Sequence, residues 1–531
     1  MSHIRTRLVS AVLALALVLG LAGCGESLTT FTWEVEHVPA NLDPQLAEES
    51  PEVIAVTHLF SGLYRKGEDG SPAFECAERC VLSADGLTYT FTLKEGLVWS
   101  GYRDQEETPL TAADFVFGLQ RTLSPETRSP WADELSGIQG AQAVLTGEAA
   151  PDTLGVSAPD DRTLVIRLES PDADFPARLC LPGAMPCNRA FFESTAGAYG
   201  LGSRTVLANG GFYLYSWTES GLFLRHAAEG ERINNLRLVL NEDAQLAEES
   251  ASGSGSASAY TVDTAARVED EKATAAWYTG SRTTRLTEIE YAAETWVLLY
   301  NTGVKGLDVP GIRAALDGVV RGLSLDFGPH RQPADGLVPP AVQLAGGSYR
   351  EQAGAMPAAA ANPRASYLAG LAELNATKLS GIGILVPKEE SQLLGQINQA
   401  WQKELSAFFT VEELTVEEIR GRVAEGDYQI ALLPLVPASG TPLGLLVQFA
   451  DRGLARLDTP EFNALLAETR GSPALAGSPA RITLLERTLL EQVPATPLFY
   501  QSGRLVLAQP IDGLVFDPFG QVPDVTGASL G

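Results

Sequence analysis

The stretch that decides the fold is residues 84–125, ADGLTYTFTLKEGLVWSGYRDQEETPLTAADFVFGLQRTLSP. Its first part alternates threonines with larger apolar side chains between Thr88 and Leu93. Because successive side chains of a strand point to opposite faces, this period of two predicts a strand with one buried face. The Asp85-Gly86 pair just before it is typical of a turn.

The second part of this stretch carries the signals of a capped helix. Thr111 can accept a hydrogen bond from the first free amides of a helix, and Asp114, three residues later, can return the bond. The carboxylate also favours the positive end of the helix. Apolar side chains then follow at a spacing of four residues, which places them on one face. We therefore expect a helix from about Ala112 to Leu123.

Several parts of the chain resemble the motifs of one protein family. Residues 85–91 (DGLTYTF), 99–100 (WS) and 108–115 (TPLTAADF) are similar to the signature of the oligopeptide- and dipeptide-binding proteins of bacterial ABC importers, family 5 of the extracytoplasmic solute-binding proteins. Residues 42–44 (LDP) and 59–64 (LFSGLY) resemble the N-terminal motif of the same family. The similarity extends over nearly the whole chain after residue 23, and the oligopeptide-binding branch matches best.

The resemblance implies an α/β fold of two lobes, of the large type with an extra subdomain in lobe one. Two hinge strands join the lobes in this fold, and we expect them near residues 292–302 and 498–507. The expected order is a lipoprotein signal peptide (1–23), a tether (24–30), lobe one (31–294, with the extra subdomain at about 65–180), lobe two (295–497) and a return to lobe one (498–531).

Patterns in the second half of the chain alternate between helices and strands, which is an α/β order. Residues 333–363 are rich in Pro, Ala and Gly and predict a loop. The remaining patterns predict helices at about 365–374, 393–408 and 416–424 and strands at about 382–386 and 411–414.

Length and charge limit the possible functions. The chain has 531 residues, 45% of them hydrophobic, and a formal net charge of -28. A chain of this size can bury a sizeable core and is expected to form two or three domains. Nucleic acid would be repelled by so much negative charge, whereas solubility is favoured by it.

The N-terminus has the pattern of an export signal. Basic residues precede an apolar run from Leu8 to Leu21, which is too short and wrongly flanked for a membrane span. Leu21-Ala22-Gly23-Cys24 resembles a lipobox, the site at which bacterial lipoproteins are cleaved before a lipid-carrying cysteine. This resemblance makes Cys24 the expected mature N-terminus and the lipid attachment site. An ordinary cleaved signal with a chance cysteine is the alternative.

Four cysteines follow Cys24, at positions 76, 80, 180 and 187. An even number in an exported protein predicts two disulfides, with three possible connectivities, and we expect the local pairs Cys76–Cys80 and Cys180–Cys187. A zinc site needs closer Cys-x-x-Cys spacing or nearby histidines, and the chain has only five histidines. No metal or other cofactor is expected.

The resemblance also implies ligand-binding residues. Glu48 falls on a family position that can meet a peptide, although a solvated loop glutamate explains the sequence at least as well. Trp131 falls on an aromatic position that lines the ligand pocket, for which core packing is the alternative. Tyr260 follows the segment ESASGSGSASA, which has the composition of a flexible linker, and is a further candidate because the family's equivalent loop faces the cleft.

Lobe two departs from the family at its usual amine anchor. Family members of the oligopeptide branch hold the peptide's α-amine with an aspartate, and Ala438 stands at that position here. In the same ungapped alignment Leu432 replaces a basic cleft residue and Leu435 a tryptophan. A buried ammonium without a carboxylate is costly, so a free amine requires another acidic group, of which Glu48 is the nearest candidate.

These observations favour a binding protein over an enzyme. The chain has no G-x-S-x-G, H-E-x-x-H, G-x-x-x-x-G-K-[ST] or helix-opening G-x-G-x-x-G motif. The resemblance implies capture of oligopeptides in a hinged cleft outside the cytoplasmic membrane, with an ABC permease and ATPase as partners. The alternatives are a non-peptide or N-blocked ligand, or a surface lipoprotein that serves as a sensor or scaffold.

Overall fold

The computed structural model describes residues 30–35, 37–101, 107–228, 230, 232–240, 262–263, 277–278, 287–328, 330–507 and 511–530. The expected signal peptide, Cys24 and Tyr260 lie outside these residues. Within the described part of the chain, no helix has the length and apolar character needed to cross a membrane.

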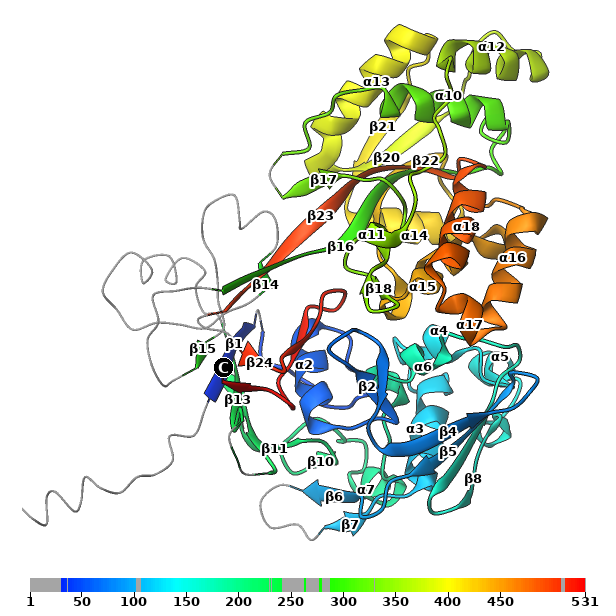
Figure 1. The fold of residues 1–531 in the computed structure, drawn as a ribbon. Helices are drawn as coiled ribbons and strands as arrows, with labels where there is room; N and C mark the ends of the chain where they lie inside the picture. The colour runs from blue at the N-terminus through cyan, green and yellow to red at the C-terminus, as the bar shows by residue number, and fades with distance from the viewer. Residues whose placement is uncertain are drawn as a thin grey trace, which may run out of the picture.

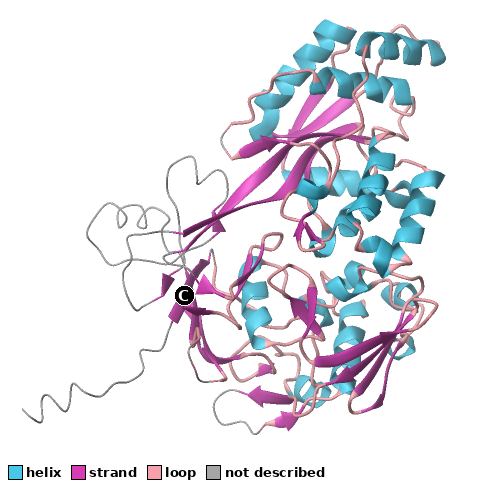
Figure 2. Ribbon diagram, in the orientation of Figure 1, coloured by secondary structure: helices cyan, strands magenta, loops and turns pink. Residues whose placement is uncertain are grey.

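The described chain forms two α/β lobes, one above the other in Figure 1, with strands and helices in both (Figure 2). Lobe one contains a sheet in the order β11-β12-β13-β1-β15 and a second, antiparallel sheet in the order β4-β5-β9-β8. Their bounds are β1 (Thr30–Val35), β11 (Phe212–Thr218), β12 (Gly221–His226), β13 (Asn235–Leu240), β15 (Trp277–Tyr278), β4 (Ala77–Leu82), β5 (Thr88–Leu93), β8 (Val156–Asp160) and β9 (Thr163–Arg167).

Smaller strand pairs and short helices complete lobe one. The helices are α2 (Ser50–Leu59), α3 (Ala112–Leu123), α4 (Ala132–Leu135), α5 (Ala141–Leu145), α6 (Phe175–Arg178) and α7 (Arg189–Ser194). The paired strands are β2 (Tyr64–Lys66) with β3 (Pro72–Phe74), β6 (Val98–Gly101) with β7 (Thr108–Pro109) and β10 (Leu207–Ala208), β24 (Ile511–Asp512) with β27 (Ser529–Leu530), and β25 (Val515–Asp517) with β26 (Val522–Asp524).

Lobe two is built on a larger sheet in the order β14-β23-β16-β22-β20-β21, with β17 also paired to β23. Its bounds are β14 (Val262–Asp263), β16 (Thr287–Tyr300), β17 (Arg331–Pro333), β20 (Gly383–Pro387), β21 (Thr410–Leu414), β22 (Ile430–Leu435) and β23 (Ala495–Leu507). The helices are α10 (Pro310–Arg321), α11 (Tyr349–Gln352), α12 (Pro363–Glu373), α13 (Ser391–Leu405), α14 (Val416–Glu425), α15 (Pro442–Leu446), α16 (Pro460–Arg470), α17 (Pro473–Ala476) and α18 (Pro479–Leu490).

The organising stretch folds as its pattern predicts. Strand β5 buries every second side chain, and α3 runs from Ala112 to Leu123 with both bonds of the capping box present. The indole Nε1 of Trp99 donates a hydrogen bond to the Asp114 carboxylate at 3.2 Å, which joins the two motifs in the core. A Cβ at Gly118 would lie 2.3 Å from the Met185 carbonyl oxygen, so glycine allows α3 to pack directly on that backbone.

The lobe-two sheet is covered on both faces. Strand β16 sends Trp296, Leu298 and Tyr300 into one apolar cluster and Val297 and Leu299 into another. Strands β20, β21 and β22 are parallel and are connected through α13 and α14, as two-sided burial of a parallel sheet requires. The strands and helices predicted for this region are confirmed with small shifts at their ends.

Strands β16 and β23 join the lobes. They pair along their length, and residues at one end of each (Tyr291, Leu505) pack in the core of lobe one, while Trp296 and Phe499 pack in lobe two. The register shifts between Ala292 and Glu294, where β16 passes from one core to the other. Both hinge strands are therefore confirmed, and the predicted lobe boundaries at 294/295 and 497/498 fall within them.

The segment predicted as a Pro-, Ala- and Gly-rich loop is more ordered than its composition implies. It contains the hairpin of β18 (Gln343–Leu344) and β19 (Gly347–Ser348), followed directly by α11. Turn-rich composition predicted the connections but not the hairpin, because its order comes from contacts with distant elements. Thr295 of β16 donates to the Leu337 carbonyl at 2.6 Å, and the Tyr349 hydroxyl donates to Glu486 of α18 at 2.7 Å.

The local disulfide pairs predicted from the cysteine count are wrong. All four cysteines are free thiols. Cys80 lies within β4 and Cys76 just before it, and four residues of strand span about 13 Å, which is beyond the reach of a disulfide. Cys187 instead packs against the Arg121 guanidinium at 3.5 Å, whereas the Cys180 thiol faces the Pro176 carbonyl. Burial raises the pKa of both Cys180 and Cys187 to about 12.

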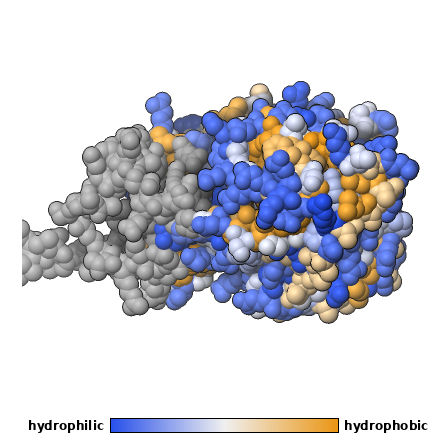
Figure 3. Space-filling model, turned by 90° about the horizontal axis from the view of Figure 1, so that it is seen from above, coloured by the Kyte–Doolittle hydropathy of each residue, from blue (hydrophilic) through white to orange (hydrophobic). Residues whose placement is uncertain are grey.

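The outer face of lobe two mixes hydrophilic and apolar areas. Figure 3 looks down on lobe two and shows hydrophilic residues interspersed with smaller apolar areas. Exposed apolar side chains of this lobe include Leu368 and Phe408.

Candidate functional site

A cavity of about 370 Å³ lies between the two lobes. Lobe one contributes the loop before α2, the start of α4 and the hairpin of β25 and β26, and lobe two contributes the turn after β22. Three of the residues predicted from the sequence, Glu48, Trp131 and Ala438, line this cavity together although they are far apart in the chain.

Trp131 is both a packing residue and a cavity residue. Its indole Nε1 donates a hydrogen bond to the Ala47 carbonyl at 2.8 Å, so the ring holds the loop that carries Glu48. A Cβ at Gly183 would approach the Trp131 side chain to 2.4 Å, so glycine at 183 leaves space for the indole. The half-buried ring thus packs against the core of lobe one and also lines the cavity, and its contact with a ligand stays a prediction.

Glu48 is exposed and lies between the buried Ala47 and the first turn of α2. No hydrogen bond or ion pair of its carboxylate is present among the described residues. The other carboxylates that line the cavity all have basic partners, namely Glu75 and Asp524 with Arg65, Asp517 with Lys66, and Glu134 with Arg178. Glu48 is thus the acidic side chain in the cavity that is available to a cationic ligand group.

The lobe-two wall of the cavity is mostly apolar and consists of Val436, Pro437, Ala438, Ser439 and Gly440. Strand β22 ends at Leu435, and the chain then passes through Val436 and Pro437 to a tight turn at Ala438–Gly440. Leu432 and Leu435, which align with polar or aromatic family positions, are buried in the two cores of lobe two and do not line the cavity.

A partly buried charge cluster lines the cavity. The Arg65 guanidinium bridges Glu75, at 3.3 Å, and Asp524. Although burial opposes it, these carboxylates hold the pKa of Arg65 above its ordinary value. His58 is neutral here: its Nδ1 donates to the Ile54 carbonyl at 2.7 Å, its Nε2 accepts from a backbone amide at 3.1 Å, and burial lowers its pKa.

Lys66 and the C-terminal hairpin were not identified as site residues from the sequence. The Lys66 Nζ lies 2.6 Å from an oxygen of Asp517, and the Phe519 ring lies beside it. The segment Phe516-Asp517-Pro518-Phe519-Gly520 has turn residues between aromatic ones, which is the signal that could have predicted an exposed hairpin tip.

Polar contacts hold the lobes together beside the cavity. The Thr441 hydroxyl donates to the Asp174 carboxylate, and Arg470 pairs with Asp172 at 3.1 Å. The Ser439 hydroxyl donates to Glu134 at 3.2 Å. In each pair one residue belongs to lobe one and the other to lobe two, so opening of the hinge would break these contacts.

Three potential metal ligands lie together in the described chain. The Nε2 atom of His37 is 3.1 Å from a carboxylate oxygen of Glu49 and of Glu52, and the second oxygen of Glu52 accepts the Ala40 amide. These contacts are those of an ion-pair cluster, and no other feature of the described structure indicates a ligand there.

Two lobes that share two long strands and enclose a cavity define a hinged ligand-binding protein. Residues 41–453 match the model of the bacterial extracellular solute-binding proteins, family 5. The chain belongs to this family.

Individual relatives are similar over different lengths. The oligopeptide-binding protein OppA of Bacillus subtilis is 24% identical over 98% of each chain. The probable deoxycholate-binding periplasmic protein YgiS of Escherichia coli is 37% identical over 35% of this chain and 34% of its own. Among solved structures, the unliganded open form of the periplasmic murein tripeptide binding protein MppA superposes with a TM-score of 0.73, at 20% identity, over 95% of this chain and 99% of that one.

Proposed function

We propose that this protein captures oligopeptides in the cavity between its lobes and delivers them to an ABC permease in the membrane. The observation that carries the proposal is the convergence of Glu48, Trp131 and the Ala438 turn on one interlobe cavity. The names of relatives such as the oligopeptide-binding protein OppA support a peptide as the ligand. Closure of the lobes about β16 and β23 would enclose it.

The charge of the cavity favours a ligand with a free amine. Five carboxylates line it, against the basic side chains of Arg65 and Lys66. Glu48 is the carboxylate without a basic partner among the described residues, so we assign the α-amine of the peptide to it. Because Glu48 is exposed, this contact contributes about 1 kcal/mol or less, and most of the affinity comes from the main chain and from packing on Trp131.

A second candidate is a ligand without a charged amine. The lobe-two wall offers Val436, Pro437 and the methyl group of Ala438, which suit an apolar or N-blocked group. The partial similarity to a probable deoxycholate-binding protein supports this alternative. The third candidate, which comes from the sequence, is a surface lipoprotein that serves as a sensor or scaffold and no longer takes part in transport.

Calorimetry with a mixed oligopeptide pool, free and N-acetylated, tests the assignment. We expect the wild type to bind both pools, with a measurable preference of about two- to fivefold for the free pool, since an exposed ion pair is weak. Glu48→Gln should remove this preference, whereas the control Glu49→Gln should keep it because Glu49 pairs with His37 and does not line the cavity.

The outcomes separate the candidates. A preference of a hundredfold or more would require a buried anchor and would contradict the role of Glu48. Equal binding of both pools by the wild type would favour the N-blocked ligand. No response to either pool would contradict peptide capture.

We further propose that a lipid on Cys24 anchors the protein to the outer face of the cytoplasmic membrane. The support is the lipobox-like sequence Leu21-Ala22-Gly23-Cys24. Cys24→Ser should move the protein from the detergent phase to the aqueous phase in detergent partitioning. A variant that still partitions with detergent would contradict the anchor.

A further inference from the structure

A second cavity of about 530 Å³ lies on the hinge side of the first. Residues of β16, including Glu290, and the loop at Pro340 and Ala341 line it. The two cavities share a wall, which consists of Lys66, Gly440, Val515, Asp517 and Phe519. In Figure 1 the C-terminal hairpin that carries three of these residues extends from lobe one toward lobe two.

The wall is held together on its lobe-one side. The 2.6 Å ion pair between Lys66 and Asp517 joins the β2 strand to the hairpin. The other oxygen of the same carboxylate accepts the Phe519 amide at 3.2 Å, which fixes the turn at the hairpin tip. The Lys66 ammonium lies 5.7 Å from the centre of the Phe519 ring, within the range of a cation–π contact.

On its other side the wall is closed by lobe two. Phe519 packs against the apolar core of lobe two, although its hairpin belongs to lobe one, whereas Phe516 of the same hairpin packs against lobe one. Gly440 has a positive φ of +70°, and a Cβ there would lie 2.8 Å from the Phe519 ring. The ring therefore rests directly on the lobe-two backbone, and opening of the hinge would separate it from Gly440.

We propose that the Phe519 hairpin tip is a movable partition, and that the second cavity is a further subsite for the continuing main chain of peptides too long for the first cavity. Hinge opening frees the ring, and a long peptide keeps it displaced after closure, while a short peptide leaves it in place. Three carboxylates, Glu68, Glu290 and Asp517, line the second cavity against one lysine, so the subsite favours neutral or basic side chains. This inference rests on the proposed peptide function and extends it to the length of the peptides that the protein can bind.

The test compares Phe519→Ala with the wild type, using a mixed tripeptide pool and a mixed hexapeptide pool in calorimetry. If the partition is displaced in about one molecule in ten, its removal should raise hexapeptide affinity about tenfold and leave tripeptide affinity unchanged. Phe519→Trp should lower hexapeptide affinity. The matched control is Gln521→Ala, because Gln521 belongs to the same hairpin tip but lines neither cavity.

Each other outcome overturns the inference in a distinguishable way. Equal changes for both pools in Phe519→Ala would show that the ring is an ordinary wall residue, with peptide binding intact. The same hexapeptide gain in Gln521→Ala would assign the effect to loosening of the hairpin. Binding of neither pool by any of the proteins would contradict the proposed function and the subsite with it.

Discussion

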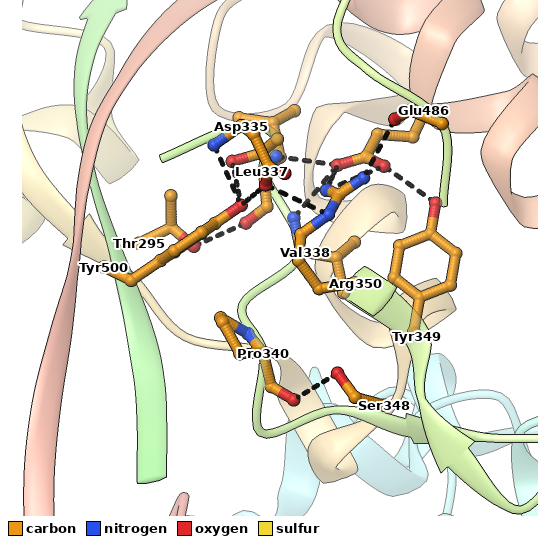
Figure 4. Close-up of polar contacts among 12 residues, drawn as sticks. Thr295, Asp335, Leu337, Val338, Pro340, Ser348, Tyr349, Arg350, Glu486 and Tyr500 are labelled. Atoms are coloured by element: carbon orange, nitrogen blue, oxygen red, sulfur yellow. Dashed lines mark hydrogen bonds and ion pairs between the residues drawn. The ribbon is translucent and has the colours of Figure 1, made fainter. Parts of the chain in front are cut away.

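The buried carboxylate of Glu486 is expected to hold a whole segment of lobe two in place. It accepts hydrogen bonds from the Leu337 amide at 2.7 Å, the Val338 amide at 3.1 Å, the Tyr349 hydroxyl at 2.7 Å and the Arg350 guanidinium at 2.9 Å (Figure 4). All of these donors belong to residues 337–350, whereas Glu486 is on α18. The same segment includes Pro340 and Ala341, which line the second cavity.

Glu486→Gln leaves the buried Arg350 guanidinium with the exposed carboxylate of Asp335, 3.2 Å away, as its ionic partner among the described residues. Glu486 and Arg350 are both almost fully buried, and breaking such a pair costs about 3–5 kcal/mol. Arg350→Met leaves the carboxylate with its neutral donors, so we expect a smaller loss of about 2–3 kcal/mol. Because the two residues share one interaction, the double variant should lose at least about 1 kcal/mol less than the sum of the single losses.

Urea unfolding followed by tryptophan fluorescence measures these losses, since Trp296 and Trp401 both lie in the core of lobe two. The matched control is Glu491→Gln, just beyond the same helix, because Glu491 is exposed and its pair with Arg487 is worth about 0.5 kcal/mol or less. If Glu486→Gln shifts the free energy of unfolding no more than this control does, or if the single losses add without coupling, the reasoning is refuted.

Two further predictions concern titratable groups. Burial, with the neighbouring Asp172 carboxylate, raises the pKa of Asp174 to about 6, from an ordinary value of 3.8, so its contribution to stability is fully present below about pH 3.8 and is lost as the pH rises through about 6. We expect Asp174→Asn, whose amide oxygen can still accept a hydrogen bond from the Thr441 hydroxyl, to flatten the change in thermal stability between pH 4 and 6. An unchanged slope would argue against this titration. The four cysteines after Cys24 should all react with a thiol reagent in denaturant without prior reduction. In the native protein, the buried Cys76 and Cys187 should react slowly. Fewer than four reactive thiols in denaturant would restore the disulfide hypothesis.

The sequence by itself determined the elements whose signals are local. The strand at Thr88–Leu93 and the helix at Ala112–Leu123 have the predicted bounds, because alternation and a capping box depend only on neighbouring residues. The hinge strands were also recognisable, since a strand buried on both faces is a continuous apolar run, as in TWVLLY at residues 295–300. Motif resemblance then placed Glu48, Trp131 and Ala438, and the fold brings these three to one cavity.

Tertiary structure decided what depends on contacts between distant segments. The four cysteines remain thiols because an extended strand separates one local pair and different neighbours surround the other, which a count of cysteines does not reveal. The order of residues 337–350 comes from contacts with distant residues, above all with Glu486, more than 130 positions later in the chain, and with Thr295 of β16, which donates to the Leu337 carbonyl. Phe519 forms part of the cavity wall because the hairpin after β23 turns back between the lobes and rests on Gly440. This contact joins residues 79 positions apart, so no local sequence pattern predicts it.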